Sequence, residues 1–283
     1  MKYGFCDLNV RESSQFIENL ANVKQLISLG YNCVAINRIH PIPENKTKDS
    51  SAVGYVNTMR NLLQKINDAL NIIKESANED LVIPSNFKLL SRLTIPLNSV
   101  DQLGFLRRGY FNQIFNGFDL IAIVPENEKV FKSLMEGKFD IDIVSLPMEG
   151  KLPFKPTKES MGLGISKEYA FEICYSTAIK SVSLRKYIFQ NGKQLVGKTK
   201  KGRGIIFSSG GNCWMDFRSP LDIVNLANLF DLKNSACYDV VKLNCERVVA
   251  HSVLRKTTFK GMASVEICNE DDGPSAKRKK SNV

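Results

Sequence analysis

The sequence predicts an α/β fold, an irregular barrel of seven or eight mostly parallel strands, from three observations. Short apolar runs recur along the chain and alternate with amphipathic segments at helical spacing. The runs are apolar on both faces, as are the strands of a parallel sheet that helices cover. The chain has 283 residues, 43% of them apolar, which is enough for one barrel core. Right-handed crossovers between such strands would close the sheet into a TIM-like barrel.

Eight apolar runs are expected to form the strands. They are Phe5–Leu8, Cys33–Ile36, Leu89–Ile95, Leu120–Val124, Ile141–Val144, Met161–Ile165, Ala170–Cys174 and Ile205–Phe207. The connection between Ile165 and Ala170 is too short for a full helix, so we expect the barrel to be distorted and incomplete.

Three amphipathic segments between the runs are predicted as helices. The first extends from Phe16 to Ile27 and has Gly30 near its C-terminal end. The others are Ser183–Val196 and Leu221–Phe230. Between residues 41 and 86 the spacing breaks, because two prolines and a polar run precede a further helix. That helix carries on one face Val56, Met59, Leu62, Ile66, Leu70 and Ile73.

The expected domain organisation is one barrel over residues 1–267, with 41–86 as an elaborated connection, and a C-terminal tail. Residues 268–283 contain almost nothing apolar, so we expect this basic tail to be disordered. Its cluster Lys277, Arg278, Lys279 and Lys280 is typical of a nuclear-localisation signal.

The cysteines and the hydropathy of the sequence indicate in which cellular compartment the chain is expected. The seven cysteines include no CxxC pair, and an odd, unpatterned set is typical of a reducing compartment. The first residues lack the apolar run of a signal peptide. The longest clean apolar stretch, Leu120–Val124, is too short to span a bilayer. We therefore expect neither a signal peptide nor a membrane contact.

Charge is distributed unevenly along the chain, whose formal net charge is +10. No acidic residue lies between Glu172 and Asp216, although this stretch holds eight Lys and Arg residues. Unopposed positive charge attracts polyanions, because each contact with a phosphate releases condensed counterions. Nucleic acid is therefore the first partner to consider, and a basic face kept for solubility is the alternative.

Nine short segments of the chain occur in the order found in one known family. Two of them flank the basic stretch, namely Phe171–Lys180 (FEICYSTAIK) and Arg218–Phe230 (RSPLDIVNLANLF). The others are Phe5–Val10, Gly30–Asn37, Ser91–Ile95, Phe118–Pro125, Lys151–Phe154, Ser208–Gly210 and Arg255–Gly261. Together they resemble the TIM-barrel protein subunit of archaeal and eukaryotic ribonuclease P, which eukaryotes share with ribonuclease MRP.

This resemblance implies a non-catalytic subunit that supports a catalytic RNA in maturing the 5′ end of precursor tRNA, and a role in rRNA processing. The implied partners are ribonuclease P RNA, ribonuclease MRP RNA, a small ribonuclease P protein with an RNA-recognition-like fold, and other ribonuclease P proteins. No cofactor is expected in the chain itself, whereas Mg²⁺ is expected for the RNA-based enzyme. The implied location is the nucleus and nucleolus.

Dispersed basic residues are the candidate RNA contacts, because Arg makes bidentate bonds to phosphate and folded RNA is recognised largely through its backbone and shape. The candidates are Arg92, Arg107, Arg108, Lys180, Arg185, Lys186, Lys201, Arg203, Arg218, Arg247, Arg255 and Lys256. For Arg92, in a predicted strand, and Arg218, at a predicted helix start, a structural role is the alternative. Nearby aromatic residues could stack on bases, although a role in the core or at a protein-partner interface is the simpler interpretation. They are Tyr175, Tyr187, Phe189, Trp214 and Phe217.

Two enzymatic alternatives fit only parts of the sequence. Gly192, Gly197, Lys198 and Thr199 match a phosphate-binding P-loop, but the predicted order is helix, loop and strand, the reverse of what that loop needs. Metal-dependent phosphoesterases of the polymerase and histidinol phosphatase type use a related barrel with many histidines. This chain has only His40 and His251. No catalytic or metal-binding residue is therefore predicted.

Ser208 and Ser209, before Gly210, could contact an RNA phosphate or simply form a turn.

Overall fold

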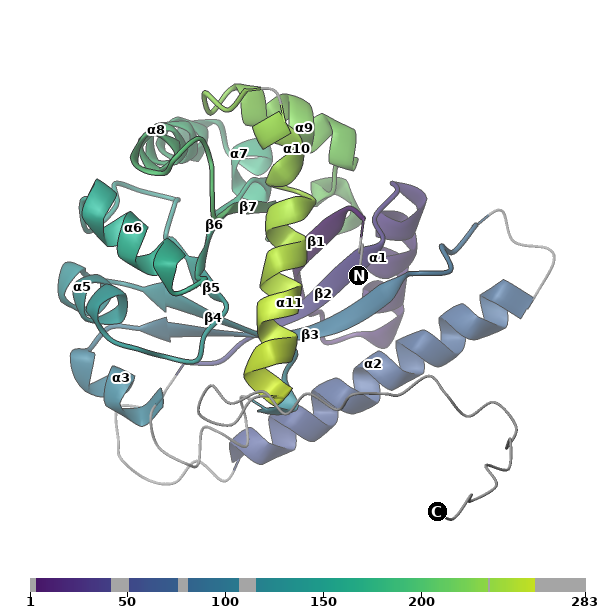
Figure 1. Ribbon diagram of the computed structural model, residues 1–283. Helices are drawn as coiled ribbons and strands as arrows, with labels where there is room; N and C mark the ends of the chain where they lie inside the picture. Colours follow the sequence, from purple (N-terminus) through teal and green to yellow (C-terminus); the bar gives the residue numbers. More distant parts are fainter. Residues whose placement is uncertain (1–3, 42–50, 76–80, 107–115, 234, 258–283) are drawn as a thin grey trace, which may run out of the picture.

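Seven parallel strands form one sheet in chain order, β1 to β7 (Figure 1). The strands are β1 (Cys6–Arg11), β2 (Cys33–Ile39), β3 (Lys88–Leu97), β4 (Leu120–Pro125), β5 (Ile143–Ser145), β6 (Ala170–Cys174) and β7 (Ile205–Ser208). The computed structural model describes residues 4–41, 51–75, 81–106, 116–233 and 235–257.

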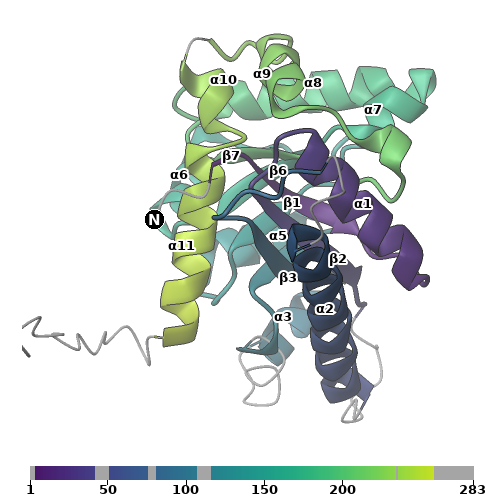
Figure 2. The same ribbon diagram turned by 90° about the vertical axis from the view of Figure 1, so that its right-hand side faces the viewer.

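Helices connect the strands and cover the outside of the sheet, and the last helix lies across one end of it (Figure 1 and Figure 2). They are α1 (Phe16–Ser28), α2 (Ser51–Glu75), α3 (Val100–Leu106), α5 (Glu128–Glu136), α6 (Lys158–Ser166), α7 (Ser176–Lys180), α8 (Val182–Lys198), α9 (Pro220–Asn228), α10 (Ser235–Asp239) and α11 (Leu243–Thr257). A single 3₁₀ turn, η1 (Trp214–Asp216), precedes α9. No helix in the described ranges is long and apolar enough to cross a bilayer.

One of the eight strand predictions is wrong, because Met161–Ile165 lies within α6. Thr157 caps this helix by accepting a hydrogen bond from the backbone N–H of Ser160 at 3.1 Å. Met161 is buried whereas Leu163 is exposed, as on a helix that packs on one face. The run is thus the helical crossover between β5 and β6. The other seven runs overlap β1 to β7, which confirms the parallel, TIM-like barrel.

The barrel closes almost completely between β1 and β7. Beyond the C-terminal end of β7, Gly210 N–H donates to Asn9 C=O at 2.9 Å, and Arg11 N–H donates to Gly211 C=O at 2.8 Å. Toward the N-terminal end, Phe207 and Cys6 donate to the carbonyls of Val240 and Val241, both at 3.0 Å. The segment before α11 therefore takes the place of an eighth strand, and the edge groups of β1 and β7 are paired.

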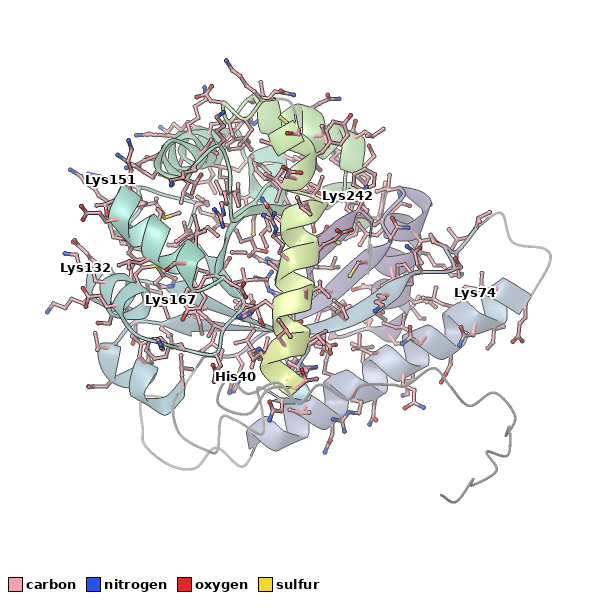
Figure 3. All side chains as sticks on the ribbon, in the orientation of Figure 1. His40, Lys74, Lys132, Lys151, Lys167 and Lys242 are labelled. Atoms are coloured by element: carbon pink, nitrogen blue, oxygen red, sulfur yellow. The ribbon has the colours of Figure 1, made fainter. Side chains whose placement is uncertain are left out.

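Two hydrophobic clusters make up the core. The larger one lies between the outward faces of the strands and the surrounding helices. The smaller one fills the barrel interior, where side chains occupy the space that the strands enclose (Figure 3). It joins inward-facing strand residues such as Leu8 and Ile206 to Cys245 and Val248 of α11. The C-terminal helix is thus an integral part of the barrel core.

Helix α11 lies across the N-terminal end of the barrel (Figure 1 and Figure 2). Asn244 donates to the carbonyls of Gly202 and Ile205, the latter at 2.7 Å, at the start of β7. Near its other end, Arg255 forms an ion pair with Asp142, 3.2 Å away just before β5. These contacts close this end of the barrel and place the exposed side of α11 beside the loops that enter β6 and β7.

Candidate nucleic-acid interface

The interior of the barrel near its C-terminal end holds a buried ion pair. TIM-barrel enzymes carry their active sites at this end of the strands. Here Arg92 of β3 and Glu172 of β6, both with fully buried side chains, face each other. Their contact is bidentate, with Nη1–Oε1 and Nη2–Oε2 distances of 2.5 and 2.7 Å. The two charges neutralise each other inside the barrel.

Hydrogen bonds satisfy the remaining polar atoms of this pair. Arg92 also donates to Leu8 C=O at 2.8 Å and to the Thr94 hydroxyl at 3.1 Å. Glu172 accepts from Ser208 and from Asn9, the latter at 3.2 Å. Burial alone would raise the pKa of Glu172, but Arg92 and these donors outweigh it, so its pKa lies below the usual value. Both groups therefore stay ionised at neutral pH.

The prediction that Arg92 contacts RNA is wrong, because its guanidinium is enclosed. Arg92 has a structural role instead, which was the alternative given for it from the sequence. A cavity of about 230 Å³ at this end has a mixed lining, which includes Asn9 and Asn37, bonded to each other, and apolar residues such as Leu146. Within the described residues, no group of three or more His, Cys, Asp or Glu side chains could hold a metal ion. His40 follows β2 at this end, whereas His251 lies on α11 at the other.

The segment after β7 forms a turn rather than a surface phosphate site. Ser208 and Ser209 are buried, and the Ser209 hydroxyl donates to Asn9 C=O at 3.1 Å. Gly210 adopts a φ of +63°, a conformation that suits glycine. A Cβ at Gly210 would lie only 3.0 Å from that of Cys174. The turn is what brings the β7 end against β1.

The P-loop pattern belongs to the end of a helix. Gly192 lies within α8 and packs against Phe230, and a Cβ there would come within 2.3 Å of the ring. Gly197 and Lys198 are the last residues of α8, and the buried Thr199 donates back to Val196 C=O at 3.1 Å. The observed order of helix, loop and strand confirms the interpretation that this is no phosphate-binding loop.

Basic side chains gather around three adjoining pockets at the N-terminal end of the barrel. The pockets measure about 360, 450 and 150 Å³, and Arg203 lines all of them. We call the cationic residues around these pockets the basic rim. It consists of Lys158, Lys198, Lys200, Lys201, Arg203 and Arg247. None of the six has an ion-pair partner in the described part of the chain. This surface is thus open to an external anion.

The remaining exposed candidates lie at the opposite end of the barrel, where internal contacts engage them. Lys180 pairs with Asp216 at 2.7 Å, and Arg185 Nε donates to Ala178 C=O at 2.7 Å. Arg218 donates to the carbonyls of Met215 and Phe217 at 2.8 and 2.7 Å. Lys186 lies 5.0 Å from the centre of the Tyr187 ring. The fold therefore separates the predicted basic stretch into two groups.

Two further candidates hold α11 in place. The Arg255 side chain is 4% exposed and bonds Asp142, while Lys256 pairs with Asp119 at 2.6 Å. Arg107 and Arg108 lie outside the described residues, as does the tail with Lys277, Arg278, Lys279 and Lys280.

The aromatic residues near the basic stretch are mostly internal. Tyr175 and Phe217 are buried, and Phe189 stacks on Phe230 with ring centres 4.9 Å apart. Trp214 is the exception, since 61% of it is exposed. Tertiary structure also adds residues that were not among the sequence-based candidates. Lys158 and Glu168 line the pockets only because α6 packs beside the loop before β7, and no local pattern indicates this.

Comparison with known proteins agrees with this architecture. The family model described as RNase P subunit p30 matches residues 4–257. The ribonuclease P protein subunit p30 of Mus musculus is 28% identical over 262 residues, covering 93% of this chain and 91% of the relative. A probable ribonuclease P protein subunit 3 of Schizosaccharomyces pombe is also 28% identical, over 91% of this chain and 97% of its own length.

A solved structure shares the fold along nearly the whole chain. A chain of the cryo-EM structure of archaeal ribonuclease P with mature tRNA superposes with a TM-score of 0.62, at 17% identity. The match covers 95% of this chain and 100% of the other. Since the family model spans nearly all of the barrel, this chain belongs to the RNase P subunit p30 family.

Proposed function

We propose that this chain is a protein subunit of ribonuclease P, and of ribonuclease MRP, that supports the catalytic RNA in maturing the 5′ end of precursor tRNA. The family match over residues 4–257 carries this proposal. A relative of Saccharomyces cerevisiae, 22% identical over 249 residues, is named a ribonuclease P/MRP protein subunit, which supports a role in both particles and in rRNA processing.

The chain contributes no cleavage chemistry in this proposal. The Arg92–Glu172 ion pair occupies the part of the barrel where related enzymes hold their reactive groups, and its atoms are already satisfied. Mg²⁺ would act with the RNA. The direct test is to incubate the purified chain with precursor tRNA and Mg²⁺. We expect no cleavage until the RNA subunit is added, and cleavage by the protein alone would restore the metallo-hydrolase alternative.

RNA would be held at the basic rim. Six Lys and Arg side chains without internal ion-pair partners in the described ranges surround connected pockets on one face, so their charge is available to phosphates. The basic residues at the opposite end of the barrel offer less positive charge to phosphates, because Lys180 is already paired with Asp216.

A protein partner would bind at the other end of the barrel, around η1. Trp214 and Met215 are 61% and 59% exposed, and large exposed apolar residues of these types are common at protein interfaces. The partner we propose is the small ribonuclease P protein with an RNA-recognition-like fold. Other ribonuclease P proteins would complete the particle.

Replacing Trp214 by Ala should weaken binding of this partner by about thirtyfold, the effect of losing roughly 2 kcal/mol at an interface hot spot. Ile72→Ala, on the exposed side of α2, is the matched control and should change the affinity less than about twofold. Isothermal titration calorimetry with the purified partner measures both. Equal affinities for wild type and Trp214→Ala would exclude η1 from the interface.

The nuclear and nucleolar location stays a proposal based on Lys277–Lys280. A fluorescent fusion truncated after Ile267 should lose nuclear accumulation when its partners are absent. Unchanged accumulation under that condition would mean that the tail is not the signal.

A further inference from the structure

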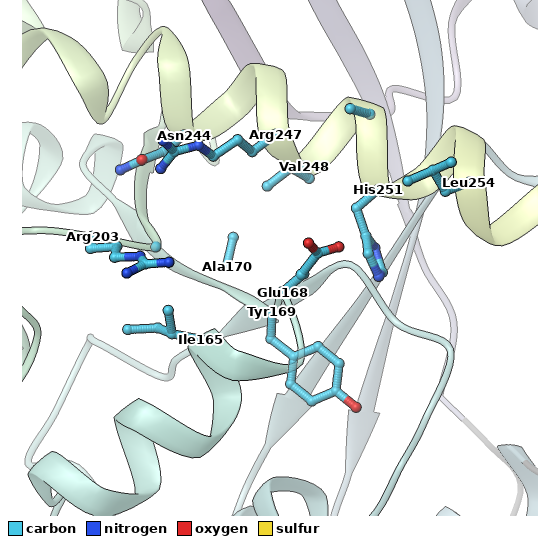
Figure 4. A pocket seen from close by; sticks show the side chains of 12 residues that line it. Ile165, Glu168, Tyr169, Ala170, Arg203, Asn244, Arg247, Val248, His251 and Leu254 are labelled. Atoms are coloured by element: carbon cyan, nitrogen blue, oxygen red, sulfur yellow. The ribbon is translucent and has the colours of Figure 1, made fainter. Parts of the chain in front are cut away.

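One of the three pockets at the basic rim, of about 360 Å³, lies beside α11 and has two chemically different ends. The pocket is enclosed by the turn from α6 to β6, the loop before β7 and α11 (Figure 4). Arg203 and Arg247 lie at one end of it, and Glu168 and His251 lie at the other. Its size is that of a small-ligand pocket rather than of a groove for a duplex.

The arginine end is suited to a phosphate group. Neither guanidinium has a hydrogen-bond or ion-pair partner among the described residues. Both arginines also line the adjoining cavity of about 150 Å³, where Lys200 and Lys201 add two positive charges and Asp239 one negative charge. Arg binds phosphate through two parallel N–H donors, so this end offers a strong site for one phosphate.

The opposite end is unsuited to a second phosphate and suited to the edge of a base. Glu168 sits at a turn with a φ of +64°, and its N–H donates to Ile165 C=O at 3.1 Å. Its carboxylate is exposed and would repel a phosphate, but it accepts hydrogen bonds from an amino group.

His251 adds a second polar atom at this end. Its Nδ1 lies 2.8 Å from Asp142 Oδ1. Because a carboxylate only accepts, Nδ1 carries the hydrogen in this contact and Nε2 remains available to a ligand. Asp142 lies just before β5 and also pairs with Arg255 of α11 at 3.2 Å.

Between the two ends the pocket wall is apolar. It includes Ala170 at the start of β6 and Val248 of α11, with Ile165 of α6 beside Arg203 (Figure 4). Such a pocket suits an unstacked nucleotide, because Arg binds its phosphate, an apolar surface covers the face of its base, and polar groups bond the edge of the base.

We propose that this pocket binds one unpaired nucleotide of the RNA. Its phosphate would lie on Arg203 and Arg247, its base on the apolar wall, and its edge against Glu168 and His251. The Glu168 carboxylate would favour a base with an exocyclic amino group over uracil. This inference rests on the proposed function, since it requires that the chain binds RNA.

The pocket can be filled without changing its charge, which separates a nucleotide site from a general phosphate surface. Ala250 is an exposed residue of α11 that lines the pocket, so Ala250→Trp should block it and leave the fold intact. Val253→Trp is the matched control, because Val253 is an exposed residue of the same helix outside the pocket. Fluorescence anisotropy with short oligoadenylate and with duplex RNA measures the effects.

Ala250→Trp should weaken oligoadenylate binding about tenfold, because the base can no longer bury its face against the apolar wall, and should leave duplex binding within about twofold. Val253→Trp should change neither. A second variant, Glu168→Gln, should reduce the preference for oligoadenylate over oligouridylate. Unchanged oligoadenylate affinity in Ala250→Trp, or an equal loss for duplex RNA, would overturn the nucleotide site while the proposed function stands. A wild-type chain that binds neither RNA would overturn both.

Discussion

Glu172→Gln is expected to lower the free energy of unfolding by about 3–5 kcal/mol, because it leaves the Arg92 charge buried without a charged partner. Equilibrium unfolding in urea measures this change. The double variant Arg92→Met, Glu172→Gln removes both charges and should recover much of the loss. If Glu172→Gln unfolded at the same urea concentration as wild type, the ion pair would not be a main support of the barrel.

Acid should also distinguish these variants. The pKa of Glu172 is lower in the folded chain than its usual value. The stability that its charge adds to the folded chain is therefore fully present at pH values above the pKa of this group in the unfolded chain. That contribution is lost as the pH falls through the folded pKa, where the buried carboxylate takes up a proton. Glu172→Gln lacks this group, and its stability should therefore depend less on pH over the acidic range.

Neutralising the basic rim is expected to have the largest effect on RNA binding. Replacing Lys200, Lys201, Arg203 and Arg247 by Gln removes four charges that have no ion-pair partner among the described residues. The slope of log K against log salt should decrease by about 0.7–0.9 for each phosphate that is no longer neutralised, or about 2 to 2.7 in total if Arg203 and Arg247 share one phosphate. Filter binding of ribonuclease P RNA over a range of salt concentrations measures the slope.

A variant with equal charge change serves as the control. Lys180, Arg185, Lys186 and Arg218 lie at the other end of the barrel, and their replacement by Gln should alter the slope by less than about one unit. A larger decrease in this variant than in the basic-rim variant would place the RNA at the opposite end.

Local patterns predicted most of the fold. Seven apolar runs became strands because residues such as Ile121 and Ile123 must be buried on the outward face of β4 while Leu120 and Ala122 fill the barrel. The strand prediction for Met161–Ile165 was wrong because a five-residue apolar run does not distinguish a buried strand from a short helix. The Thr157 cap, which precedes the run, was the sequence signal that could have separated them.

The site was only partly predictable, since its residues come together through tertiary structure. Arg92 and Glu172 are 80 positions apart, and no local pattern pairs them. The acid-free stretch includes Lys201 and Arg203, which line one pocket, but it also includes Lys180, which the fold places at the other end beside Asp216. Arg247 and Glu168 reach the same pocket only because α11 crosses the barrel end.

The most direct test of the central claim is an omission experiment with the reconstituted particle. Precursor-tRNA cleavage would be followed for the complete particle, for the particle without this chain, and for the particle with the basic-rim variant. We predict that omission lowers the cleavage rate, that wild-type chain restores it, and that the variant restores it only at low salt. Full activity without the chain would contradict a supporting role, and full rescue by the variant at all salt concentrations would contradict RNA binding through the basic rim.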